Sequence, residues 1–314
     1  MIETAGFCCY LDGQPDHLTP AHQLAARWNE NMAGHPLFLN KNFDFNPIGT
    51  SSVMDFTDGF AAIENMIWVR NSITNTAMPF WISPQLRSDL AGLDNGKPVS
   101  LLREDDSRCL AMAGVLTSPT YESMRNEAMA AMLSRAAEQV RTRGFAPVAG
   151  LIHPFHISAL RRYFRTLIRT GKLTFGDLQS SRRYFAHNEP TAKFFHTQLT
   201  QTVSMVVGQR VKPSYVYFAS YQEGATLEKH TDREQCQFSI SFCLDYSPEP
   251  LRQTAWPLQI HTLEGVTKVY QSIGDGVVYL GCVLPHSRDL LPTGHTSTSI
   301  FFHYVPESFS GPLD

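Results

Sequence analysis

The chain has 314 residues, of which 43% are hydrophobic and 18% charged, and its formal net charge is −3. This composition suits one large folded domain or two smaller ones, and it lacks the basic excess of a nucleic-acid-binding protein and any apolar stretch of roughly 18 residues that could span a bilayer. The start of the chain does not resemble a signal peptide and its six cysteines form no Cys-x-x-Cys pair, so we expect a soluble, cytoplasmic protein with reduced thiols.

The first part of the chain, residues 1–145, contains no functional motif. Thr19-Pro20 is a typical helix start, with a capping hydroxyl followed by proline, and Gly34-His35-Pro36 would end that helix. Between about residues 37 and 117 the apolar residues are interrupted by Asp, Gly and Asn, which favours short strands and turns over long helices. We therefore expect an N-terminal α/β region, of mixed helix and short strands, whose role the sequence does not indicate.

Residues 118–208 carry clearer helix signals. Ser118-Pro119 opens a helix that Gly144 closes, and the apolar residues 145–152 follow as a strand. A further helix is expected from about residue 157 to 170, and Glu189-Pro190 begins another that runs to about Val207. The segment around Arg183 between these two helices is expected to be a loop. We assign residues 146–314 to a second region in which these helices support a β-structure.

From Val211 onward, short apolar runs alternate with turn residues. Even spacing of short strands indicates a β-sandwich or barrel, so the expected fold class is α+β with a barrel core. The predicted strands are 215–221, 238–244, 258–261, 266–270, 277–283 and 298–305.

A possible metal site follows the first of these strands, where His230 and Asp232 are two residues apart. Residues two apart on a strand point to the same side, although a lone His-x-Asp pair fits a surface turn equally well. His286 follows a later strand and is the preferred third ligand. His295 lies in a turn, and His303 lies in an apolar run where a core or strand-edge role is expected. Two imidazoles and one carboxylate can hold non-haem Fe(II) and leave positions open for oxygen and a co-substrate.

The pattern Tyr221-x-x-Gly224-x-x-Leu227-x-x-His230-Thr231-Asp232, followed by Gly274-Asp275-Gly276 and Leu284-Pro285-His286, resembles the Fe(II)/2-oxoglutarate-dependent dioxygenase superfamily. Its closest branch is the prolyl-4-hydroxylase-like group. The resemblance covers roughly residues 150 to 305 and is absent from the first 140 or so. It implies a double-stranded β-helix, also called a jelly roll, with His230, Asp232 and His286 as the catalytic metal ligands.

The same resemblance implies Fe(II) as the metal, 2-oxoglutarate as the co-substrate and molecular oxygen as the oxidant. The expected reaction is hydroxylation of an unactivated C–H bond in a small molecule, an amino acid or a peptide. Related halogenases have Gly or Ala where this chain has Asp232, so the carboxylate favours hydroxylation over halogenation.

The expected anchor for the far carboxylate of 2-oxoglutarate is missing from its usual place. Family members place Arg or Lys about nine or ten residues after the distal histidine, where this chain has His295 and Thr296. We predict that Arg288, with Tyr221 and the hydroxyls of Thr296 and Thr298, binds this carboxylate, because a guanidinium can donate two parallel hydrogen bonds. Arg288 could equally be a surface-loop residue, and a different oxo acid would also fit.

Two other functional classes stay open on the sequence. The chain could be a jelly-roll protein that has lost catalysis and binds a partner, or a cupin-like enzyme that uses another divalent metal such as Mn or Zn. No motif encodes the oligomeric state, for which a homodimer is one option.

Overall fold

The computed structural model describes residues 6–12, 35–46, 59–61, 64–100 and 102–314. They form two compact units, the first from Met1–Ala131 with Ile152–Leu160 and the second from Met132–Leu151 with Arg161–Asp314. Helices α5 (Pro119–Arg143) and α6 (Pro154–Arg169) each contribute to both units. The helix predicted from Thr19-Pro20 lies outside the described residues. No helix in the described part of the chain is long and apolar enough to cross a membrane.

The first unit contains two small antiparallel sheets, one with the order β2-β3-β4 and one made of β1 and β5. Trp68, Phe80 and Trp81 are almost fully buried in its core. Its elements are β1 (Phe38–Leu39), β2 (Phe43–Asp44), β3 (Met66–Arg70), β4 (Ala77–Trp81), α3 (Pro84–Ala91), α4 (Glu104–Ala113) and β5 (Leu116–Thr117).

Between residues 37 and 117, where short strands and turns were favoured over long helices, the structure has short strands and two short helices, α3 and α4. The Ser83 hydroxyl caps α3 by accepting the Leu86 N–H at 3.1 Å, and Pro84 opens the helix. Three acidic residues occupy the first turn of α4, where the positive end of the helix dipole stabilises their negative charges. Gly114 ends this helix with a φ of 79°. These are local signals that an apolar-pattern reading overlooks.

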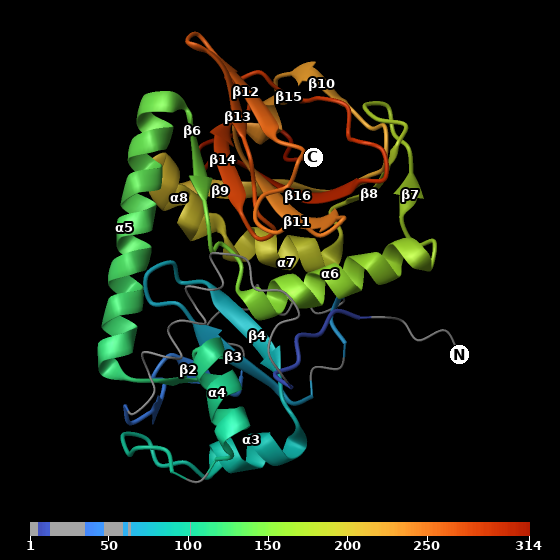
Figure 1. Ribbon diagram of the computed structural model, residues 1–314. Coiled ribbons are helices and arrows are strands. Elements are labelled where there is room, and N and C mark those ends of the chain that lie inside the picture. The colour runs from blue at the N-terminus through green and yellow to red at the C-terminus, as the bar shows by residue number, and fades with distance from the viewer. Residues whose placement is uncertain (1–5, 13–34, 47–58, 62–63, 101) are drawn as a thin grey trace. The chain divides into compact units, whose positions relative to one another are not determined.

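The second unit is built from two antiparallel sheets. The large sheet has seven strands in the order β6-β14-β11-β16-β9-β8-β7, and the small sheet has four in the order β10-β15-β12-β13. From β9 onward the chain passes back and forth between the two sheets, apart from the β12–β13 hairpin within the small sheet, an arrangement consistent with the predicted jelly roll (Figure 1). The strands are β6 (Phe145–Val148), β7 (Thr174–Phe175), β8 (Arg183–His187), β9 (Val211–Tyr221), β10 (Leu227–His230), β11 (Phe238–Ser247), β12 (Leu258–Thr262), β13 (Gly265–Val269), β14 (Gly276–Leu280), β15 (His286–Arg288) and β16 (Thr296–Pro306).

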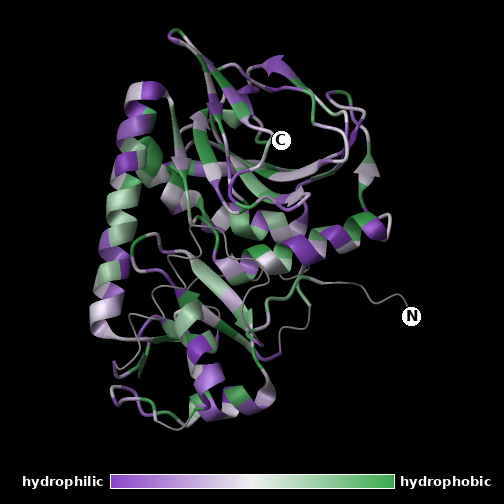
Figure 2. Cartoon of the chain, in the orientation of Figure 1, coloured by the Kyte–Doolittle hydropathy of each residue, from purple (hydrophilic) through white to green (hydrophobic). Residues whose placement is uncertain are grey.

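Apolar side chains from both sheets meet between them. Val277 and Tyr279 of the large sheet belong to the same buried cluster as Leu258 and Ile260 of the small sheet. The opposite face of the large sheet is covered by helices, since Phe164 of α6 stacks on Phe218 of β9 with ring centroids 4.1 Å apart. Figure 2 shows the matching pattern on α6, where hydrophobic and hydrophilic residues alternate around the helix.

Two details of the second unit differ from the sequence expectation. The single helix expected after Glu189-Pro190 is divided at Leu199 into α7 (Pro190–Gln198) and α8 (Thr200–Val207). The segment at Arg183, expected to be a loop, is strand β8, which pairs with β9. A short 3-10 helix, η2 (Glu234–Cys236), follows the predicted metal site.

Candidate metal centre

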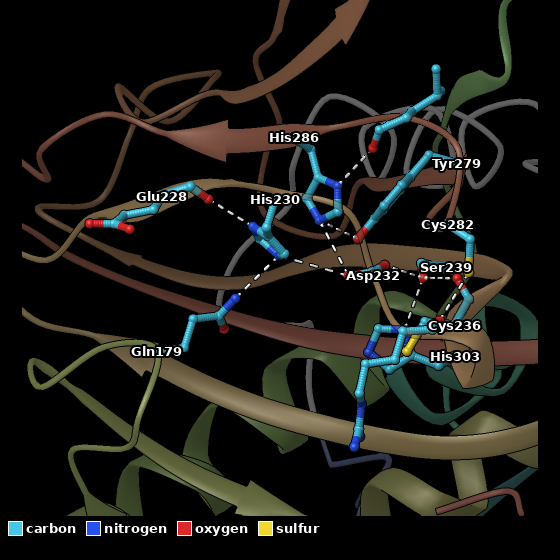
Figure 3. Close-up of polar contacts among 12 residues, drawn as sticks. Gln179, Glu228, His230, Asp232, Cys236, Ser239, Tyr279, Cys282, His286 and His303 are labelled. Carbon is cyan, nitrogen blue, oxygen red and sulfur yellow. Dashed lines mark hydrogen bonds and ion pairs between the residues drawn. The ribbon is translucent and has the colours of Figure 1, made fainter.

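Neighbouring strands of the small sheet bring the three predicted metal ligands together. His230 of β10 is the direct cross-strand partner of His286 of β15, and their ring centroids are 4.4 Å apart. Asp232 follows β10, and its Oδ1 lies 3.8 Å from His230 Nε2 and 3.5 Å from His286 Nε2. All three ligand atoms lie within 4.8 Å of one another (Figure 3), so a single ion could contact them all.

Backbone carbonyls orient both imidazoles. His230 Nδ1 lies 2.7 Å from the Glu228 carbonyl oxygen, and His286 Nδ1 lies 3.0 Å from that of Leu284. A carbonyl oxygen can only accept a hydrogen bond, so each Nδ1 must carry the proton. The Nε2 atoms therefore face Asp232, and Nε2 is the atom through which each ring can bind a metal.

The carboxylate of Asp232 is fixed by its own contacts. Its Oδ2 accepts a hydrogen bond from the Ser239 hydroxyl at 2.9 Å. A Cβ atom at Gly281 would lie 2.3 Å from this oxygen, so only glycine allows the close approach. Burial raises the pKa of Asp232, but the contacts with His286 and Ser239 outweigh it and lower the pKa to about 2. The carboxylate is thus ionised at neutral pH.

His303 also belongs to this site, although the sequence favoured a core or strand-edge role. It is buried, but it lines the same cavity as the triad, and its Nδ1 lies 2.9 Å from the Ser239 oxygen. Because Ser239 gives its single proton to Asp232, His303 must donate in turn to Ser239. Burial lowers the pKa of His303 to about 4, so this neutral histidine orients the carboxylate through Ser239. His295, the other alternative for the third metal ligand, instead contacts the Tyr246 hydroxyl at 2.8 Å.

A second possible group of ligand atoms shares Asp232 and consists of Asp232, Cys236 and His303. Burial raises the pKa of the Cys236 thiol to about 12, and this thiol lies 3.0 Å from the Tyr215 hydroxyl. A metal ligand must be a thiolate, so this group is less suited to an ion than the triad.

A cavity of about 540 Å³ opens on the triad and is lined mainly by aromatic and polar side chains. Tyr221, the predicted co-substrate contact, lines it, and its hydroxyl accepts a hydrogen bond from Arg183 at 2.8 Å. Arg183 also forms a buried ion pair with Asp177 and donates to Gln179. Neither Arg183 nor Gln179 stands out in the sequence, because the site residues that they contact, Tyr221 and His230, are distant in the chain.

Arg288 is buried, so the alternative of a surface-loop arginine is wrong. Its guanidinium donates to the Trp256 carbonyl at 2.6 Å and to Gln271 Oε1 at 3.1 Å, while its Nε has no hydrogen-bond partner. Burial lowers its pKa, and no carboxylate among the described residues forms an ion pair with it. Arg288 does not line the cavity directly: its guanidinium lies over the Trp256 ring, which in turn packs 5.0 Å from the ring of Tyr221.

The two predicted threonines do not join this group. In the register between β16 and β9, Ser297 is the partner of Tyr221, so it shares the cavity-facing side. Thr298 is the partner of Ser220 on the opposite, helix-facing side, where its hydroxyl donates to the Ser220 oxygen at 2.9 Å. Side chains alternate along a strand, so Thr296 faces the same way as Thr298. The expectation that these two hydroxyls bind the co-substrate is therefore corrected.

No model of a known protein family matches this chain, and no curated protein matches it. Among solved structures, a prolyl-4-hydroxylase from Pseudomonas putida is 18% identical, with 56% of this chain and 100% of that chain covered and a TM-score of 0.45. An oxidoreductase of the 2OG-Fe(II) oxygenase family from Burkholderia pseudomallei is 11% identical, with 55% and 89% covered and a TM-score of 0.43. A prolyl hydroxylase from Trichoplax adhaerens, in complex with a hypoxia inducible factor peptide fragment, is 15% identical, with 61% and 95% covered and a TM-score of 0.49.

Proposed function

We propose that this protein is an Fe(II)- and 2-oxoglutarate-dependent oxygenase built on a double-stranded β-helix. The observation that carries the proposal is the convergence of His230, Asp232 and His286, with the Nε2 atoms of both imidazoles facing the carboxylate. Two histidines and one carboxylate on one side of an ion form the ligand set of non-haem Fe(II) oxygenases, which leaves the remaining positions open.

The donor atoms present fit Fe(II), which with 2-oxoglutarate and oxygen would supply the oxidising chemistry when bound. The protein's own residues would bind the metal and orient its ligands. His230, Asp232 and His286 would hold the metal. The hydrogen bonds from His303 to Ser239 and from Ser239 to Asp232 fix the Asp232 carboxylate. Such partners of a ligating carboxylate raise metal affinity by holding it in one orientation.

We further propose that Arg288 binds the far carboxylate of 2-oxoglutarate. A fully buried cation normally has an anionic partner, and none of the described carboxylates pairs with Arg288. Its Nε remains a free donor, which leaves one edge of the guanidinium available for a bound carboxylate. Small side chains surround this position on the inner face of the large sheet: Ser241 contacts Arg288, and the β16 register puts Ser297 and Ser299 on the same side.

Hydroxylation of a C–H bond in a small molecule, an amino acid or a peptide is the reaction we propose. The Asp232 carboxylate supports it, since this group occupies the place that a halogenase leaves open. The aromatic cavity beside the triad is where the substrate would bind. In the described part of the chain, no observation favours a protein that has lost catalysis, because both imidazoles and the carboxylate are oriented as ligands.

The test is anaerobic titration of the Fe(II)-loaded protein with 2-oxoglutarate. We expect a metal-to-ligand charge-transfer band from chelation, followed by succinate formation when oxygen is admitted. The His286→Ala variant should lose both signals, whereas His295→Ala, which removes a histidine outside the triad, should keep both. A band and succinate yield that survive His286→Ala would refute the proposal. Binding of Mn or Zn without any 2-oxoglutarate band would favour the cupin-like alternative.

A further inference from the structure

The loop between β7 and β8 holds Gln179 against a metal-binding histidine (Figure 3). Gln179 Nε2 lies 3.2 Å from His230 Nε2. The loop is folded around Asp177, whose Oδ1 accepts the backbone N–H groups of Gln179 at 2.9 Å and Ser180 at 2.8 Å. The other oxygen of Asp177 pairs with Arg183 at the start of β8. Gln179 is thus placed by a fixed turn.

The orientation of the Gln179 amide follows from its two partners. Arg183 donates to Gln179 Oε1 at 3.0 Å, and because a guanidinium has only donors, the amide oxygen must face Arg183. The NH₂ group therefore faces His230. Since the proton of His230 is on Nδ1, its Nε2 lone pair accepts the hydrogen bond from Gln179.

That lone pair is also the one that would bind a metal. One lone pair cannot serve both partners, so metal binding requires Gln179 to release His230. Arg183 would keep the amide tethered at its oxygen, so that the NH₂ group would stay beside the metal site. An oxygen atom of a co-substrate bound beside His230 would then offer this NH₂ group a new acceptor.

We propose that Gln179 is a positioning residue with two alternating partners: His230 when no metal is bound, and a 2-oxo acid oxygen when metal and co-substrate are bound. This inference rests on the proposed function for its second half only. Arg183 supports it, because the same guanidinium donates to Gln179 and to the hydroxyl of Tyr221, which lines the cavity. One buried side chain therefore orients two groups that face the co-substrate.

The proposal predicts effects of opposite sign for Gln179→Leu, which keeps the side-chain bulk and removes the donor. The Co(II) affinity of the metal-free protein should rise about three-fold, because His230 no longer has to be released. The 2-oxoglutarate affinity of the Co(II)-loaded protein should fall about ten-fold, because a hydrogen bond to a charged oxygen is lost. Cobalt absorbance measures the first constant and calorimetry the second.

Two further variants control for the fold of the loop. Ser181→Ala changes an exposed neighbour and should leave both constants unchanged. Gln179→Asn keeps an amide that is too short to reach and should behave like Gln179→Leu. A loop that merely loosens would weaken both constants together, and that result, or no change in either, overturns the proposal. If the wild type binds Co(II) but not 2-oxoglutarate, the proposed function fails, and the cobalt titration still decides whether Gln179 holds His230.

Discussion

Two arginines are buried near the candidate site, and their surroundings are opposite. Arg183 and Arg288 are both 4% exposed. Arg183 forms an ion pair with Asp177 and donates to tyrosine hydroxyls. Arg288 is surrounded by a backbone carbonyl, an amide oxygen and a serine hydroxyl, with no carboxylate.

This difference in ion pairing distinguishes Arg183, a structural cation, from Arg288, a cation that is available to a ligand. The charge of Arg183 is balanced within the fold, so this residue can organise the β7–β8 loop without any bound molecule. The charge of Arg288 is hydrogen-bonded but not balanced, and a buried unbalanced charge is costly. A bound dicarboxylate would remove that cost, which is why we propose Arg288 as the anchor for the far carboxylate of 2-oxoglutarate. Each prediction below tests one side of this contrast.

The largest effect is expected for Arg288→Met. The 2-oxoglutarate affinity of the Fe(II)-loaded protein should fall roughly thousand-fold, as expected when one partner of a buried charged pair is lost. Arg288→Lys should recover part of the affinity. The charge-transfer band gives the measurement, and Co(II) affinity, which should not change, is the control. Retention of wild-type 2-oxoglutarate affinity in Arg288→Met would place the anchor elsewhere.

Arg183→Met should act mainly on stability. It leaves the largely buried Asp177 carboxylate without its cation, and we expect a loss of about 3 kcal/mol in the free energy of unfolding. Urea denaturation measures it, with Arg182→Met, an exposed neighbour, as the matched control. If Arg288→Met destabilises the fold as much as Arg183→Met, the contrast between the two sites is wrong.

Ser239→Ala tests whether the metal ligands are independent of both arginines. Removal of the hydroxyl breaks the hydrogen-bonded link between His303 and Asp232, and metal affinity should fall roughly ten-fold. Ser241→Ala is the control, because this serine lies two residues further along β11 and contacts Arg288 instead. Equal metal affinities for the two variants would show that Ser239 does not orient the carboxylate.

The smallest effect concerns pH. Burial raises the pKa of Asp177, but hydrogen bonds from Tyr217, Ser180 and Arg183 outweigh it and hold the pKa below its ordinary value. A depressed pKa adds stability above the unfolded-state value near 4, and this stability is lost as the pH falls through the folded-state value. The loss in free energy of unfolding caused by Arg183→Met, relative to the wild type, should therefore be about 1 kcal/mol smaller at pH 3.5 than at pH 7.

Arg288→Met provides the comparison for this pH series. Arg288 has no carboxylate partner among the described residues, so the effect of its loss on unfolding should stay constant over the same range. Urea unfolding of the two variants and the wild type at each pH gives the answer. A deficit of Arg183→Met that does not change with pH would mean that Asp177 is not the group that this arginine stabilises.

Sequence patterns predicted the elements whose signals are local. Apolar runs located most strands of the two sheets, and capping residues located both ends of α5, whereas α6 begins at Pro154 rather than near residue 157. Strands β10 and β15 were missed because they are short and mostly polar, as Figure 2 shows for β10. Their polarity has a reason, since these strands carry His230 and His286.

Prediction of the site residues from the sequence likewise succeeded where the signal is local and failed where it depends on the tertiary fold. His230, Asp232 and His286 were found because a conventional spacing marks them. Thr298 was expected at the co-substrate from its place in the family pattern, but the register that pairs it with Ser220 puts it on the helix-facing side, and a shift of one residue turns every side chain over. The contribution of Gln179 was not predictable, because only the tertiary fold brings it to His230.

The pairing of His230 with His286 also sets when the site can exist during biosynthesis. The four strands between these two residues in the sequence, β11 to β14, belong to both sheets, so the pairing of β10 with β15 joins distant parts of the chain. Such non-local pairing is slow to form, so the ligands meet late in folding. A nascent chain that does not yet include His286 would present only His230 and Asp232, so a metal that needs all three residues could be held only after His286 has been made.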